Sequence, residues 1–247
     1  METTNPEQVD AAEANPHALI APWWHTLLVI SLIVGTSVLG SLQSRKHGFG
    51  GHHAANYLLT IAWEWVLAAI VYWGIRLRRV PLRQLLGERR HGWKALGIDV
   101  AAALIFWTMS TVILAALAVP FRLAHMQEAQ KVIAQLAPQN LYEFLIWVAL
   151  SVTAGFCEEL IFRGYLQQQF ARIGRRAWIG VAASAVCFGS AHGYEHFSGV
   201  VLITAYGAMF SVLVIKMRSL RPAMMAHAWH DLFTGAMLAL AKHLRLL

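Results

Sequence analysis

The chain has 247 residues, of which 57% are hydrophobic and only 13% are charged. Because charged residues make up about a quarter of a typical soluble domain, this composition excludes an ordinary soluble protein and indicates one membrane domain. The formal net charge is +7, but the basic residues lie between apolar stretches rather than in one patch with interleaved aromatic residues, which argues against a nucleic-acid partner.

The N-terminal segment, residues 1–22, contains four acidic residues and no lysine or arginine. It therefore lacks the basic start of a secretory signal and is predicted to form a mobile tail. Seven apolar stretches follow, each near the roughly 20 residues that a spanning helix needs. The sequence predicts an all-α, polytopic transmembrane helical bundle with about seven spans. These spans are Trp24–Leu42, Tyr57–Leu77, Ala95–Val119, Leu141–Leu166, Ala177–His192, Ser198–Lys216 and Pro222–Ala241.

The loops between these spans alternate in their content of lysine and arginine. Since cytoplasmic loops carry the excess of basic residues, the alternation predicts a multi-pass protein of the cell (plasma) membrane with a cytoplasmic N-terminus. The loop after the first predicted span is an exception, because it should lie outside and yet holds Arg45 and Lys46. The segment Phe121–Asn140 is amphipathic and is expected to lie at the membrane interface. The loops rich in basic residues are Leu77–Lys94, Gln167–Arg176 and Lys216–Arg221.

Residues 23–140 are expected to hold the first membrane helices with a basic cytoplasmic loop, and residues 141–241 the helices that carry a site. Three spans in this second part contain ionisable residues, which cost roughly 2.5–3.5 kcal/mol each at a bilayer centre and so indicate function. Glu158 and His192 each lie 17 residues from Arg175, the tip of the predicted hairpin between the fourth and fifth spans. They are therefore expected at the same depth.

The spacing of these residues predicts how they pair. Glu159 and Arg163 are four residues apart, which favours an ion pair on one face of a helix. Glu158 is turned about 100° away from that face and is free to share a water molecule with His192. A carboxylate and an imidazole that remove a proton from water provide the chemistry of amide hydrolysis.

His227 and Asp231 are also four residues apart, and both present to one side of the seventh predicted span. They could stabilise the oxyanion of a tetrahedral intermediate or orient the scissile carbonyl. The predicted catalytic residues are thus Glu158, His192, His227 and Asp231, with Glu159 and Arg163 in support.

Several residues have plainer interpretations. Glu159 and Arg163 could equally form a purely structural ion pair. His230 is interpreted as a packing residue, because the helical period turns it away from both His227 and Asp231. Asp99 is a single acidic group near a span end, and Glu64, in the second span, has no assigned role.

A metal site is the alternative to water activated by a glutamate alone. His192-Gly193-Tyr194-Glu195-His196 matches H-x-x-E-H, a zinc motif that needs a helix, whereas Gly193 follows the end of a predicted span. The four predicted catalytic residues, Glu158, His192, His227 and Asp231, are plausible Zn²⁺ ligands as well. We favour a site without a cofactor, and chelation is the test.

The ordered set Glu158-Glu159-x-x-x-Arg163, Phe188-x-x-x-His192 and His227-x-x-x-Asp231 resembles the signature of the CPBP family of intramembrane peptidases. The resemblance covers about Leu141–Leu240. It implies a helical intramembrane endopeptidase that cleaves a membrane-associated substrate, either a prenylated CAAX protein or a bacteriocin-like peptide.

By position, the resemblance implies that Glu158 and His192 activate water and that His227 and Asp231 form the oxyanion site. Glu159 and Arg163 would hold the helix of the glutamates in place. Many family members carry asparagine where this chain has Asp231, and an ionised aspartate accepts a hydrogen bond but cannot donate one.

Two other function classes fit the same residues. A non-proteolytic membrane scaffold or immunity protein of the same fold would not depend on Glu158 and His192, and a proton-coupled transporter would use the buried carboxylates as a relay. The predicted partners are membrane lipid and a peptide or protein substrate, with no nucleic acid. The sequence sets no oligomeric state.

Overall fold

The computed structural model describes residues 18–47, 53–88, 91–126 and 128–244. Most of the predicted N-terminal tail lies outside these ranges. Within them the fold is helical, and the only β-type contact is an isolated bridge between Gly87 and Ser219. In chain order the elements are α1 (Trp23–His47), α2 (His53–Leu77), α3 (Leu82–Leu86), α4 (Trp93–Leu117), α5 (Val119–Leu123), α6 (Glu128–Leu136), α7 (Leu141–Glu158), the π-helix η3 (Glu159–Leu166), α8 (Gln167–Ile173), α9 (Ala177–Ala191), the 3₁₀-helix η4 (Gly193–Glu195), α10 (His196–Met217) and α11 (Arg221–His243).

The helices form a membrane bundle, as predicted. Among the described residues, five helical segments are long and apolar enough to cross a membrane by themselves: Trp23–Ser44, His53–Leu77, Trp93–Leu123, Leu141–Ile173 and Gly193–Met217. Large apolar side chains on their outer faces are exposed, which suits contact with lipid rather than water.

The two remaining predicted spans, α9 and α11, differ from these five. α9 is apolar but has only 15 residues, which at 1.5 Å per residue is shorter than the roughly 30 Å hydrocarbon core. α11 has 23 residues, but His227, His230 and Asp231 lower its hydropathy. The fourth predicted span is longer than expected, because the helix continues through η3 and α8 to Ile173.

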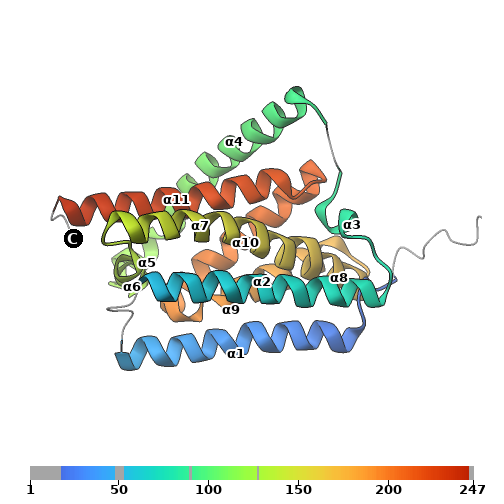
Figure 1. The fold of residues 1–247 in the computed structure, drawn as a ribbon, viewed down its shortest axis with the longest axis horizontal. Coiled ribbons are helices and arrows are strands. Elements are labelled where there is room, and N and C mark those ends of the chain that lie inside the picture. Colours follow the sequence, from blue (N-terminus) through green and yellow to red (C-terminus); the bar gives the residue numbers. More distant parts are fainter. Residues whose placement is uncertain (1–17, 48–52, 89–90, 127, 245–247) are drawn as a thin grey trace, which may run out of the picture.

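The packing of the bundle is centred on α7. α2 and α11 both pack along α7, and α9 packs along α10. Figure 1 shows α1 on one outer side of the bundle and α4 on the other, where α4 slants away from α11. The core combines residues of α1, α2 and η3, among them Val29, Val71 and Ile161.

The π-helix η3 begins where the acidic pair of the sequence lies. All eight of its residues are buried. A π-helix has a wider turn than an α-helix, and such turns are frequent at functional sites. A buried hydrogen bond joins α1 to this segment, since His25 Nδ1 lies 2.9 Å from Tyr165 Oη. Just before α1, the Ala21 carbonyl accepts a second buried bond from Gln169 Nε2 of α8 over 2.8 Å.

The predicted amphipathic segment contains two short helices, α5 and α6. α6 packs against η4 and α10, and its own residues Ala129 and Val132 are buried. The Tyr57 hydroxyl of α2 donates a hydrogen bond to the Leu136 carbonyl at the end of α6. The segment therefore closes the same end of the bundle as η4.

Candidate active site

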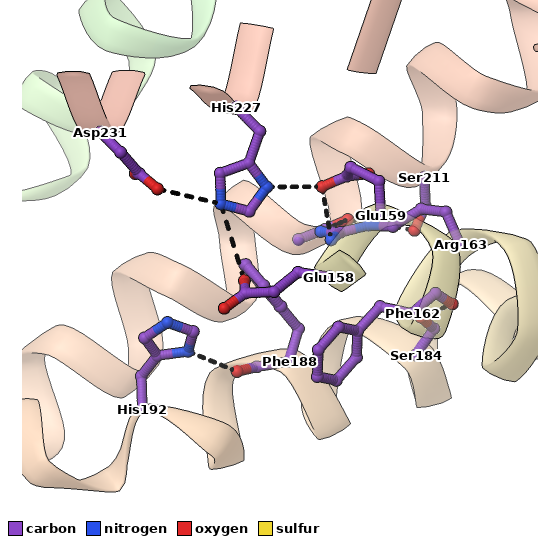
Figure 2. A network of polar contacts seen from close by, with 11 residues as sticks. Glu158, Glu159, Phe162, Arg163, Ser184, Phe188, His192, Ser211, His227 and Asp231 are labelled. Atoms are coloured by element: carbon purple, nitrogen blue, oxygen red, sulfur yellow. Dashed lines mark hydrogen bonds and ion pairs between the residues drawn. The ribbon is translucent and has the colours of Figure 1, made fainter. Parts of the chain in front are cut away.

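The predicted site residues come from four neighbouring elements (Figure 2). Glu158 is the last residue of α7, and Glu159 and Arg163 belong to η3. His192 follows α9 directly, and His227 lies on α11 with Asp231 one turn later. The fold thus brings together residues that the chain separates by up to about 70 positions.

His227 is the centre of the polar network in Figure 2. Its Nδ1 lies 2.8 Å from Glu159 Oε1. Its Nε2 lies 3.6 Å from Glu158 Oε2 and 3.7 Å from Asp231 Oδ2. The residue is only 5% exposed. Because a carboxylate can only accept, Nδ1 carries a hydrogen and donates to Glu159.

Aromatic rings hold the His227 imidazole in this orientation. The ring of Phe210 is stacked on it at 5.3 Å between centroids, and the ring of Phe188 meets it edge-on at 5.9 Å. Packing and the bond to Glu159 together restrict the ring, so that Nε2 faces Glu158 and Asp231.

The predicted ion pair between Glu159 and Arg163 is present, and it is fully buried. Arg163 Nη1 donates to Glu159 Oε1 over 2.9 Å, and Nη2 donates to the Gly207 carbonyl over 3.2 Å. The guanidinium lies 4.2 Å from the centroid of the Phe188 ring, a cation–π contact. Glu159 therefore joins η3 to α11 as well as to Arg163, a contact that the i, i+4 spacing alone did not predict.

His192 is oriented by its own helix. Its Nδ1 lies 2.9 Å from the Phe188 carbonyl oxygen, which can only accept, so the hydrogen is on Nδ1. In the neutral ring Nε2 is then free to accept a hydrogen bond. Figure 2 shows His192 on the same side of the network as Glu158. Among the residues that the structure describes, no hydrogen bond or ion pair joins these two side chains directly.

Glu158 and Asp231 are the two more accessible acids. Their side chains are 17% and 29% exposed. Glu158 Oε2 is buried and makes no hydrogen bond. The backbone of Asp231 is held by Trp147 of α7, whose indole Nε1 donates to the Asp231 carbonyl over 2.9 Å. This bond fixes the position of α11 along the axis of α7.

The geometry also answers two side questions from the sequence. His192 ends one helix and His196 begins another, with a φ of 61° at His196, so H-x-x-E-H does not lie on the single helix that the zinc motif needs. Within the described ranges, no three or more His, Cys, Asp or Glu side chains are grouped as metal ligands. His230 packs its ring on Tyr206 at 4.9 Å, as a packing residue would.

Two features of the site had no clear signal in the sequence. The bond between Glu159 and His227 joins residues 68 positions apart, and only the tertiary fold brings them together. Glu64 of α2 is buried, at 6% exposure, and interacts electrostatically with Glu158 and Asp231. The sequence indicates Glu64 only as an acidic residue inside an apolar predicted span.

Comparison with known proteins finds a family match, over the part of the chain that contains the site. The family model "Type II CAAX prenyl endopeptidase Rce1-like" matches residues 138–233, a stretch that contains all six predicted site residues. Neither a curated protein nor a solved structure matches the chain.

Proposed function

We propose that the chain is an intramembrane endopeptidase of the CPBP type in which Glu158 and His192 activate water, and the match of residues 138–233 to the Rce1-like family model supports this proposal. One observation carries this proposal. Two histidines are held by hydrogen bonds through Nδ1, His227 to Glu159 and His192 to the Phe188 carbonyl, so that both Nε2 atoms remain for chemistry around Glu158.

The reaction begins at Glu158. In its ionised form this carboxylate removes a proton from a water molecule that also donates to His192 Nε2. The water oxygen forms a bond to the scissile carbonyl carbon, and the carbonyl oxygen becomes an oxyanion. Glu158 then transfers the proton to the amide nitrogen as the C–N bond breaks, so the products are a carboxylic acid and an amine. Burial between helices excludes other water and strengthens each of these interactions.

His227 is the proposed oxyanion partner. In its doubly protonated form the ring donates from Nδ1 to Glu159 and from Nε2 toward the developing negative charge. Asp231, 3.7 Å from Nε2, keeps the imidazolium in place rather than donating to the oxyanion itself. Aspartate can thus occupy a position where many family members have asparagine.

The proposed substrate is a membrane-associated protein or peptide. The name of the matched family supports a prenylated CAAX-type substrate, and a bacteriocin-like peptide is the alternative. The proposed setting is the plasma membrane with the N-terminus in the cytoplasm. The rival function is a scaffold or immunity protein of the same fold, which would not need Glu158.

The test compares the termini of membrane proteins, by mass spectrometry, in cells that express the wild type or Glu158→Gln at equal abundance. New termini that form only with the wild type identify both hydrolysis and substrate. Identical termini, in cells where the protein still acts, would contradict the peptidase and favour the scaffold.

A second test concerns metal. We propose that no metal ion takes part, so cleavage should continue after treatment with a strong chelator, and metal in the purified protein should be substoichiometric. Stoichiometric zinc that is lost together with activity would instead assign Glu158, His192, His227 and Asp231 as ligands.

A further inference from the structure

Glu64 of α2 is a buried acid that none of the three sequence motifs contains. The residue is 6% exposed, and its Oε2 is a buried atom that makes no hydrogen bond. A buried polar atom without a partner costs free energy. Such a group inside a spanning helix therefore needs an explanation, and its surroundings provide one.

Two aromatic contacts place Glu64 at the depth of the site. α2 runs beside α7 in the same direction (Figure 1). Tyr57 meets Trp147 at 5.3 Å between ring centroids, and further along the two helices Trp65 is stacked on Phe156 at 5.6 Å. Because Trp65 lies beside Phe156 on these parallel helices, Glu64 is offset from Glu158 by about three residues, or roughly 4.5 Å along the axis, which is less than one helical turn.

The side chain of Glu64 is directed inward. Trp65 is 51% exposed on the outer face of α2, and the helical period turns Glu64 about 100° away from it. The titratable groups that interact with Glu64 are Glu158 and Cys157 of α7, Asp231 of α11 and Tyr194 of η4.

The charges around Glu64 determine the form that it takes. Of the four groups just named, Glu158 and Asp231 are carboxylic acids and none is a cation. Burial beside other carboxylates strongly disfavours the ionised form of a carboxyl group. Glu64 is therefore a neutral carboxylic acid, which has one O–H donor.

We propose that Glu64 is a positioning residue of the site, whose neutral carboxyl group donates a hydrogen bond to a water molecule that in turn donates to the Glu158 carboxylate. This inference rests on the peptidase function proposed above. The Oε2 atoms of both residues are buried and lack a protein hydrogen-bond partner, and one bridging water satisfies both. The bond holds Glu158 in the orientation that water activation requires.

The test uses two substitutions of similar length. Glu64→Gln keeps a hydrogen-bond donor, whereas Glu64→Met has none. In isolated membranes with equal amounts of each protein, we measure the initial rate at which the wild-type-specific termini form. Glu64→Gln should stay within about threefold of the wild type, and Glu64→Met should be about tenfold slower or more. Val66→Ala is the matched control, because Val66 is 47% exposed, lies on the opposite side of the same turn of α2 and should retain the rate.

The outcomes separate this inference from the proposed function. If Glu158→Gln forms these termini as fast as the wild type, the proposed activation of water by Glu158 is wrong. If Glu158→Gln is inactive while Glu64→Met keeps the full rate, only the role of Glu64 is overturned. Equal losses in Glu64→Met and Glu64→Gln also contradict a donated hydrogen bond. Should Glu64→Met fail to fold, the infrared spectrum decides: a protonated-carboxyl band must be present in the wild type and absent in Glu64→Gln.

Discussion

At the scale of single residues, Glu159 makes more polar contacts within the fold than its neighbour Glu158. One oxygen of Glu159 accepts from Arg163 and from His227 at the same time, over 2.9 and 2.8 Å. Both partners are buried. The Arg163 guanidinium lies over the rings of Phe188 and Phe210, and the His227 ring is stacked on Phe210. Glu159 therefore contributes both to the stability of the fold and to the orientation of His227, the proposed oxyanion partner.

Replacing Glu159 by glutamine should destabilise the fold. Without its counterion, the buried guanidinium of Arg163 is left uncompensated, so the free energy of unfolding should fall by about 3–5 kcal/mol. Denaturant unfolding of the purified protein in detergent measures this change. Glu88→Gln is the control, because Glu88 pairs with Arg218 over 3.5 Å in an exposed position, where such a pair contributes about 1 kcal/mol or less. Equal losses in the two variants would contradict this account.

At the scale of elements, the site depends on the close approach of α7 and α11. Gly155 permits this approach, since a Cβ at that position would lie 2.7 Å from the Met224 carbonyl oxygen and 2.9 Å from the Ala228 nitrogen. These are backbone atoms, so a side chain cannot move aside to relieve the overlap. Any larger residue must displace α11, which carries His227.

Gly155→Ala should therefore lower both stability and activity. A displacement of about 1 Å in reacting groups can cost about 100-fold in rate, and we expect a loss of that order with a lower unfolding temperature. Gly97→Ala in α4 is the control. Nothing lies within 4 Å of a Cβ there, and alanine should stabilise the helix by up to about 1 kcal/mol. An active, stable Gly155→Ala protein would be inconsistent with the packing described.

At the same scale, local patterns were predictable from the sequence and distant contacts were not. The pair of Glu159 and Arg163 followed from spacing along one helix. The bond from Glu159 to His227 did not, because it depends on how η3 lies against α11. The hydropathy of α11 is lower than that of the five long apolar segments, because the polar residues of the site offset its apolar ones.

At the scale of the whole molecule, composition was enough to predict a helical membrane bundle. The orientation of that bundle remains a prediction from the basic loops. The loop between α8 and α9 contains Arg175, which is exposed, and the opposite end of the fourth predicted span contains Tyr142, which is 64% exposed. Tyr142 lies near the start of one continuous helical segment, Leu141–Ile173, and Arg175 follows its other end.

Cysteine labelling tests the orientation. In a chain whose native Cys157 and Cys187 are replaced by alanine, Tyr142→Cys should react with an impermeant maleimide on intact cells. Arg175→Cys should react only after the membrane is permeabilised, because basic loops face the cytoplasm. The reverse pattern would invert the topology without altering the site.

The most direct test of water activation by Glu158 is the cleavage rate of the Glu158→Gln protein, purified and returned to liposomes with the substrate identified by its new termini. Glutamine keeps the size of the side chain but is not a base. We predict a loss of about 1,000-fold or more in rate, with an unfolding temperature unchanged from the wild type. A folded Glu158→Gln protein that cleaves at the wild-type rate would contradict the central role given to this carboxylate.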